Sequence, residues 1–282
     1  MMTKLTRHPA RVLVLLAAAL LVLPSCWMSP SHWAENEGRL EVPLEDFTAV
    51  HVKTHNGDIA CRPVDGTGEV VEVRFVRKGG GRSDEDALAA LTAIDVFAET
   101  EGDTLRIGWR WSTRRQQGWA ARVRFEVDGP PAFRYTAESH NGDVSVVGIQ
   151  GAVQADTHNG DIHVAEASAD VRAASHNGDI RIETHGASFE AATHNGDIHA
   201  NLAKSESVGG RIETHNGDVE VVAGPATSSS FHFDTRNGSF RGKDVGADVS
   251  VGKRSAAGKL GAGGPELRIE THNGDLRLKR RE

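Results

Sequence analysis

The sequence of 282 residues predicts an all-β protein, a parallel β-solenoid (β-helix) with coils of 18 residues, preceded by less regular β coils. Two observations predict this fold. The first is a repeated His-Asn-Gly-Asp string, which begins at His55, His140, His158, His176, His194, His215 and His272. The second is an apolar alternation around each string that keeps the same phase in every copy. A short period kept this closely is typical of stacked-repeat architectures.

The spacing of the strings defines the coil. After His140 they follow at intervals of 18, 18, 18 and 21 residues, and another 21 residues lead to Arg236-Asn237-Gly238. From Arg236 to His272 the distance is 36 residues, or twice 18. We therefore expect a coil at the midpoint, Arg254–Ala257, whose corner has lost its signature. The regular solenoid is predicted over residues 139–282.

Each repeat contains two short strands that meet at a corner. Val171 and Ser175 lie on one face before the corner, and the alternation slips by one residue after Gly178, so that Ile180 and Ile182 continue the apolar face. An Asn-Gly pair suits this corner, because Gly adopts the positive φ that a sharp bend needs. Stacked coils place each strand beside its equivalent in the next coil, about 4.8 Å away.

Stacking also aligns identical side chains into columns. By the alternation, the Thr or Ser and the Asn of each corner are expected to point inward, where each Asn amide donates to the carbonyl of the next. We interpret the Asn-Gly pairs as structural. The central ones are Asn159 and Gly160, Asn177 and Gly178, and Asn195 and Gly196.

The N-terminus predicts export. Three basic residues precede the apolar run Val12–Leu23, which is too short to span a bilayer comfortably, so residues 1–25 are interpreted as a signal peptide. The run ends in Leu23-Pro24-Ser25-Cys26, which resembles the lipobox of bacterial lipoproteins and implies lipidation of Cys26. Two alternatives stay open: a free Cys26 that pairs with Cys61, or an uncleaved anchor.

The expected location is the cell envelope, with a lipid anchor in the membrane. In a double-membraned cell, Trp27 instead of Asp after Cys26 implies the outer membrane. Residues 26–46 are predicted to be a tether between lipid and domain. Cys61 replaces the Val or Ile of other repeats and is expected to be a buried apolar residue.

Charge and composition exclude some partners. The formal net charge is −7, and it becomes −10 when Lys4, Arg7 and Arg11 are removed with the signal. Nucleic acid binding needs a basic surface, so this class is excluded. Two cysteines allow neither a disulfide framework nor a cysteine zinc site. The partner is expected to be an envelope or extracellular protein or a glycan.

Residues 47–138 are less regular. Alternation predicts strands within residues 69–75, 104–109 and 122–127, and Ser83 followed by acidic residues predicts a short helix over residues 83–92. We expect longer, looped coils here that begin and cap the solenoid.

The repeats Thr157–Val164 and Thr214–Val221 resemble the bacterial putative-adhesin family of β-strand repeat proteins, which repeats Thr-x-Asn-Gly-Asp-Ile-x-Val. The resemblance covers roughly residues 40–282. It implies a β-solenoid on a secreted or envelope protein and supplies no catalytic residue. The position before Asn is His in seven of the eight corners that keep Asn-Gly, which departs from the family pattern.

That His and the Asp three residues later are expected to point outward in parallel rows. Neighbouring imidazoles with a carboxylate are ligands for Zn or Ni, so a divalent metal site is one interpretation, with His163 and His199 as further ligands. The other interpretation is a solvated ladder without metal. The candidate ligands are His140, His158, His176, His194, His215, Asp143, Asp161, Asp179 and Asp197.

Two functions remain open. The first is a noncatalytic, adhesin-like or structural envelope protein. The second is a β-helix enzyme that acts on polysaccharides through a site in residues 76–138. That region supplies loop material with Trp and Arg side chains that can contact sugars: Arg110, Trp111, Arg114, Arg115 and Trp119. The regular coils have turns too short to wall a cleft, which favours the first function.

Overall fold

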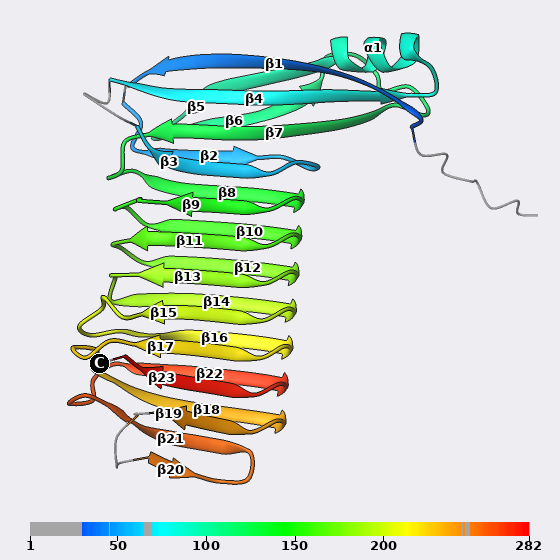
Figure 1. The fold of residues 1–282 in the computed structure, drawn as a ribbon. Helices are drawn as coiled ribbons and strands as arrows, with labels where there is room; N and C mark the ends of the chain where they lie inside the picture. The colour runs from blue at the N-terminus through cyan, green and yellow to red at the C-terminus, as the bar shows by residue number, and fades with distance from the viewer. Residues whose placement is uncertain (1–29, 45, 65–68, 244, 246–248, 282) are drawn as a thin grey trace, which may run out of the picture.

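The computed structural model describes residues 30–44, 46–64, 69–243, 245 and 249–281, which form two long sheets and one helix, α1 (Asp84–Thr92) (Figure 1). Sheet A has eleven strands in the order β1 (His32–Pro43), β4 (Val70–Gly81), β7 (Ala120–Gly129), β3 (Ile59–Pro63), β9 (Val144–Val147), β11 (Ile162–Ala167), β13 (Ile180–Thr184), β15 (Ile198–Leu202), β17 (Val219–Ala223), β23 (Leu276–Arg280) and β19 (Phe240–Lys243). Sheet B has twelve strands in the order β20 (Val249–Val251), β21 (Ser255–Leu260), β18 (Ser229–Asn237), β22 (Glu266–Asn273), β16 (Gly209–Asn216), β14 (Ser188–Asn195), β12 (Val171–Asn177), β10 (Val153–Asn159), β8 (Arg134–Asn141), β2 (Ala49–Lys53), β6 (Thr104–Trp111) and β5 (Ile94–Glu101).

The predicted all-β fold with parallel stacked strands is confirmed. Each coil has one strand in sheet B and one in sheet A, and the coils form a regular stack in Figure 1. In sheet A, β11 pairs in parallel with β13, which puts Ile162 beside Ile180, and β13 pairs with β15, which puts Ile180 beside Ile198. These three side chains are fully buried between the sheets, so the apolar alternation identifies the inner face correctly.

Corner hydroxyls fill the inner edge of the stack. The Thr or Ser before each His is buried, as expected. From Ser139 onward its hydroxyl donates to the carbonyl oxygen of the corner Gly in the neighbouring coil, whereas Thr54 donates to the carbonyl oxygen of Val123. In the central coils the bonds run from Thr157 to Gly142 at 2.9 Å, from Ser175 to Gly160 at 3.0 Å and from Thr193 to Gly178 at 3.0 Å. The polar column therefore lies inside the coils without unpaired hydroxyls at these three positions.

The coil order at the C-terminal end differs from the order along the chain. Strand β22 pairs with β16 on one side and β18 on the other, so the last coil sits between two earlier ones. The coil expected at Arg254–Ala257 is wrong: β21 begins at Ser255 and runs antiparallel to β18. The 36-residue spacing thus holds an antiparallel excursion, which covers the end of sheet B, instead of one more coil.

The first coil is enclosed in the same way. Strand β2 lies between β6 and β8, and β3 lies between β7 and β9, so residues 104–129 form a coil outside the one that begins the repeat pattern. Beyond this outer coil, β4 and β5 pair antiparallel with β7 and β6. The expected strands and helix are all present. Ser83 caps α1 and accepts a hydrogen bond from the Asp86 backbone N–H at 3.1 Å.

The predicted tether over residues 26–46 is wrong for most of its length. Residues His32–Pro43 form β1, which pairs antiparallel with β4 along all twelve positions. Leu40 and Val42 are half-buried against the core, which holds this segment in the sheet. The alternation of apolar and polar residues around them is weak, so the strand was not predicted. Cys26 and the predicted signal peptide, residues 1–25, lie outside the described residues.

Cys61 is buried, as predicted, and burial raises the pKa of its thiol to about 12. It behaves as an apolar residue at a position that other coils fill with Val or Ile. No helix within the described ranges is long and apolar enough to cross a membrane.

Candidate functional site

The seven His residues form one uninterrupted column on the outer face of sheet B. Each follows a buried Thr or Ser, so strand alternation turns the imidazole outward. Neighbouring ring centroids are 4.5–4.9 Å apart along the whole column. The interplanar angles are 2–7°, except for 26° between His215 and His272. In stacking order the column is His55, His140, His158, His176, His194, His215 and His272.

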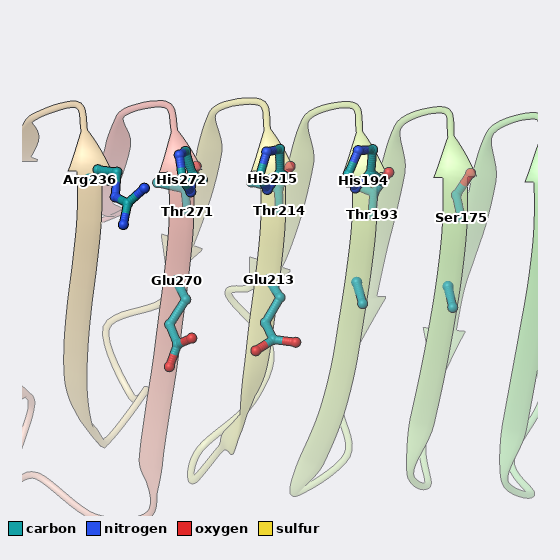
Figure 2. Close-up of a pocket in the computed structure, with 12 residues that line it drawn as sticks. Ser175, Thr193, His194, Glu213, Thr214, His215, Arg236, Glu270, Thr271 and His272 are labelled. Carbon is teal, nitrogen blue, oxygen red and sulfur yellow. The ribbon is translucent and has the colours of Figure 1, made fainter.

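The enclosed last coil makes the column continuous. Because β22 inserts beside β16, His272 stacks on His215, and Arg236 of the next coil lies at the end of the column, as Figure 2 shows. Chain order alone would have placed Arg236 next to His215. An arginine influences each end, since Arg115 acts on His55 and Arg236 acts on His272.

Burial and like charges favour neutral rings at the two ends. Burial lowers the pKa of His55, and neighbouring His140 and Arg115 lower it further. The pKa of His272 is lowered by loss of solvation and then by His215 and Arg236. A neutral imidazole presents one N–H donor and one nitrogen acceptor, so these rings can both give and receive a hydrogen bond.

The Asn residues form the predicted amide ladder, but not inside the protein. Asn177 donates to the side-chain oxygen of Asn159 at 2.8 Å, and Asn195 donates to Asn177 at 2.8 Å. All three side chains are exposed, which corrects the expectation that they point inward. The alternation breaks at the corner itself, so the rule that holds along the strands fails for Asn.

The Asp row has a structural role. In the central coils the carboxylate of each Asp accepts the backbone N–H of the equivalent Asp one coil further along the stack, with distances of 2.8–2.9 Å. These bonds satisfy N–H groups that sheet A does not pair. The central members of the row are Asp143, Asp161, Asp179 and Asp197.

The structure brings the predicted His ligands into one column and the predicted Asp ligands into one row, but it does not converge them on a common point. Among the residues it describes, no group of three or more His, Cys, Asp or Glu side chains is placed to hold a metal ion. The reason is geometric: the stacked rings are parallel, so their in-plane lone pairs run side by side instead of converging. His163 and His199 lie on sheet A, away from the column, and His199 Nδ1 contacts Glu220 Oε2 at 3.1 Å.

An open groove runs beside the column. It lies between the imidazoles and the residue two positions earlier on each strand, and its floor follows the Thr and Ser column (Figure 2). In Figure 2 the Glu213 and Glu270 side chains extend away from the rings. Both carboxylates accept from an arginine on their own strand, Arg211 and Arg268 respectively. We call this feature the lower groove; it is lined by Ala174, Ser175, Ala192, Thr193, His194, Glu213, Thr214, His215, Arg236, Glu270, Thr271 and His272.

A second hollow of the same construction lies at the other end of the column. Its walls are His55 and His140 on one side and Lys53 and Glu138 on the other, and Trp109 also lines it. Lys53 Nζ contacts Glu138 Oε2 at 2.6 Å. Burial raises the Glu138 pKa, but Lys53 and His51 outweigh it, and the net pKa is lowered. We call this feature the upper hollow. Neither feature was predicted from the sequence, because each depends on how side chains from neighbouring coils are arranged beside the His column.

The aromatic and basic residues of the 76–138 region serve the cap. Trp119 is buried against α1, with Trp111 packed beside it at a centroid distance of 5.8 Å. Arg110 pairs with Asp95 and Glu99 at 3.0 Å and lies over the Phe97 ring. Arg115 donates to the Trp119 carbonyl oxygen at 2.9 Å. The structure therefore engages Arg110, Trp111, Arg115 and Trp119 in packing or pairing, and Arg114 is exposed.

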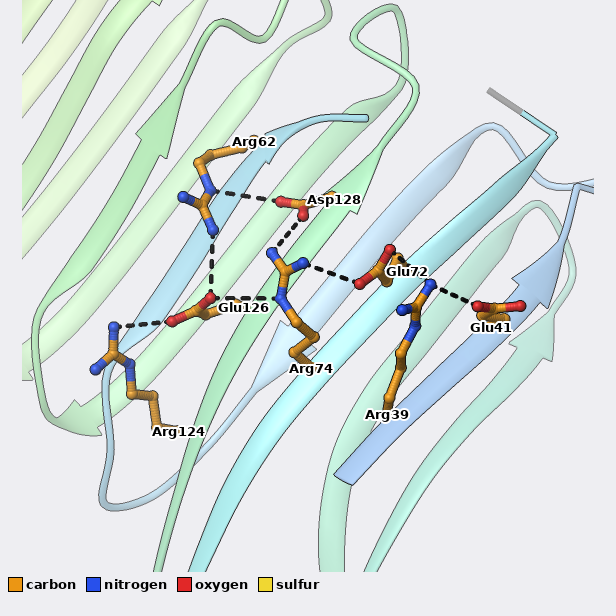
Figure 3. A network of polar contacts seen from close by, with 8 residues as sticks. All are labelled: Arg39, Glu41, Arg62, Glu72, Arg74, Arg124, Glu126 and Asp128. Atoms are coloured by element: carbon orange, nitrogen blue, oxygen red, sulfur yellow. Dashed lines mark hydrogen bonds and ion pairs between the residues drawn. The ribbon is translucent and has the colours of Figure 1, made fainter. Parts of the chain in front are cut away.

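Ion pairs join the cap strands on the outer face of sheet A (Figure 3). Arg74 of β4 contacts Asp128 of β7 at 2.5 Å and also contacts Glu72 of its own strand at 2.9 Å. Arg39 extends the network to β1 through Glu72 at 3.1 Å. Each carboxylate has an arginine partner, so this network is a clamp between strands and offers no free acid-base pair.

One family model matches most of the chain. The family model described as Toastrack DUF4097 matches residues 24–279. No curated protein sequence matches the chain.

Several solved structures are similar, at low identity. One is a putative adhesin from Bacteroides fragilis, with 11% identity, a TM-score of 0.43, and coverage of 89% of this chain and 99% of that one. Another is a putative lipid binding protein from Parabacteroides distasonis, with 10% identity, a TM-score of 0.40, and coverage of 88% and 97%. A third is a putative cell adhesion protein from Clostridium sporogenes, with 9% identity, a TM-score of 0.33, and coverage of 87% and 100%.

Proposed function

The chain belongs to the Toastrack DUF4097 family, and from that premise we propose that it is a noncatalytic, adhesin-like protein of the cell envelope. One observation carries the proposal: the stack presents the same side chains at the same place in coil after coil, as the His column does. A long periodic face suits repeated weak contacts with a partner better than it suits chemistry at a single point.

The distribution of perturbed groups supports a noncatalytic role. The largest upward pKa shifts in the described part of the chain belong to Cys61 and Tyr135, and both groups lie inside the stack. Catalytic sites concentrate such shifts in open clefts. In the lower groove, by contrast, the carboxylates of Glu213 and Glu270 are held by arginines.

A screen for bond cleavage tests this role against the polysaccharide-active enzyme. The full chain is incubated with envelope and plant polysaccharides, and new reducing ends or unsaturated products are measured. We expect none. Cleavage that Arg114→Ala or Trp109→Ala abolishes would replace the proposal with an enzyme whose site lies in the cap.

The proposed anchor is a lipid on Cys26. It is supported by the signal-like residues 1–25 and by the Leu-Pro-Ser-Cys ending. The chain needs only five residues to pass from Cys26 to the start of β1 at His32, so an anchored stack would be held close to the membrane surface. Cys26→Ser is expected to release the protein from the membrane fraction, and mass spectrometry of the mature N-terminus identifies the lipid. A membrane-bound Cys26→Ser protein would contradict the anchor.

A further inference from the structure

The lower groove runs along the stack and crosses the strands. Its floor is formed by Ser175, Thr193, Thr214 and Thr271, which come from four successive strands of sheet B. The backbone groups of these strands are already used in parallel pairing. An occupant therefore cannot add as a further strand here, and side chains must recognise it at intervals of one coil.

One wall of the groove offers the same hydrogen-bonding group in every coil. The imidazoles stack face to face, so they present their edges, not their ring faces, to an occupant. A neutral imidazole edge carries a donor and an acceptor. Hydroxyl groups have the same double character, which makes a polyhydroxylated chain the matching chemistry.

The opposite wall leaves space and almost no net charge. In two coils this wall is formed by the small side chains of Ala174 and Ala192. In the next two coils it is formed by Glu213 and Glu270, whose carboxylates accept hydrogen bonds from arginines. Arg172 pairs with Glu190 at 3.6 Å in the same region of the face. The nearby charges are three carboxylates, Glu190, Glu213 and Glu270, and four cations, Arg172, Arg211, Arg236 and Arg268. This balance favours neither a polyanion nor a polycation.

We propose that the lower groove binds a linear, uncharged polysaccharide that lies along the stack, a proposal that rests on the noncatalytic envelope function. The polysaccharide contacts the edges of the His194, His215 and His272 rings in successive coils. The upper hollow, built on the same rows, provides a second contact for a long chain, where the half-buried Trp109 supplies an aromatic surface.

Binding of defined glycans to the full chain, kept in detergent, tests the proposal. The probes are uncharged linear oligosaccharides and polysaccharides (β-linked glucans, mannans and N-acetylglucosamine oligomers), with alginate as the anionic and chitosan as the cationic comparison. Calorimetry is expected to find at least one uncharged probe that binds more tightly as its chain lengthens. The affinity is expected to fall as the pH drops below 6.5, because His272, whose pKa is lowered, loses its acceptor when the ring gains a proton.

Two arginine substitutions provide the matched control. Ala192→Arg fills the groove and is expected to weaken binding by about tenfold or more, which is about 1.4 kcal/mol. Ala165→Arg adds the same side chain at a half-buried, outward position of sheet A and is expected to leave the affinity unchanged. Ala174→Arg repeats the test one coil away if Ala192→Arg does not fold, as judged by its thermal melt.

The outcomes separate this proposal from the broader one. If no uncharged probe binds, if a charged probe binds best, or if Ala192→Arg binds as tightly as the wild type, the glycan site is wrong. None of these three results contradicts the noncatalytic envelope function, because the stack can still bind a different ligand, or bind at a different place, without cleaving it. Cleavage of any probe contradicts the envelope function itself.

Discussion

At the scale of single residues, the corner glycines are needed because neighbouring coils approach closely. A Cβ added at Gly160 would overlap the carbonyl of Gly142, and one at Gly178 would overlap the carbonyl of Gly160. The φ of Gly178 is positive, as expected for the bend, but at 159° it is almost extended. The contact with the next coil, more than the bend, therefore excludes larger residues at this position.

Gly178→Ala is expected to lower the free energy of unfolding by about 2–3 kcal/mol, because the methyl group must push two coils apart. Gly102→Ala is the control: Gly102 has a φ of 62°, but nothing lies within 4 Å of an added Cβ. Its cost should be limited to backbone strain of about 1 kcal/mol. Urea titration of both variants measures the difference. Equal losses would mean that coil contact does not set the requirement for glycine.

The amide ladder gives a second prediction at this scale. Asn177→Ala removes the hydrogen bond that Asn177 donates to Asn159 and the one that it accepts from Asn195. We therefore expect the free energy of unfolding to fall by about 1–2 kcal/mol. Asn36→Ala, at an exposed position of β1, should change the stability by less than about 0.5 kcal/mol. Urea titration measures both effects. Equal effects would show that the amide hydrogen bonds of the ladder do not stabilise the stack.

At the scale of elements, the His column makes the stack sensitive to acid. Charging one ring opposes the charging of its neighbour less than 5 Å away. The pKa values of His55 and His272 are lowered in the folded protein, for the causes given above, so the unfolded chain binds more protons as the pH falls through its ordinary value of 6.5. The stability that these neutral rings contribute is complete above that pH and is lost below it.

Thermal melts between pH 7.5 and 5 are therefore expected to show a falling melting temperature below about pH 6.5. The double variant His55→Gln/His272→Gln should lose less than the wild type, whereas His185→Gln, off the column, should follow the wild type. Glu138 does not confuse the result, because its lowered carboxyl pKa gives stability that is lost only when the pH falls below the ordinary value of 4.5. A melting temperature that rises on acidification would contradict the account.

At the scale of the whole molecule, both ends of the repeat pattern are enclosed. The coil of His55 lies beneath the β6–β7 coil, and the coil of His272 lies between those of His215 and Arg236. In a simple solenoid the terminal coils are the ones exposed at the ends. Here, antiparallel strands cover the ends instead: β4 and β5 at one, and β20 and β21 over sheet B at the other.

The features that recur in every coil were predictable from the sequence. The features that occur at one place in the stack were not. The phase of Ile162 and Ile180 follows from local alternation, so it could be read from a single coil. The position of the last coil could not, because Phe233 and Ile269 both suit the inner face and pairing with either neighbour satisfies the alternation. The column was predictable for the same reason as the phase. The lower groove could not be predicted in this way, because the small residues that help to form it, Ala174 and Ala192, occur in only two successive coils.

The order of the coils makes the His column continuous and places Arg236 at the end of the lower groove. Cysteine cross-linking tests it most directly. Glu213 lies beside Glu270 in the parallel register, on the outer face, within the span that a disulfide needs. Buried Cys61 does not interfere. We expect Glu213→Cys/Glu270→Cys to form a disulfide under mild oxidation and Glu213→Cys/Asp234→Cys to remain reduced. A disulfide in the second variant and none in the first would show that the coils follow chain order and would contradict the account.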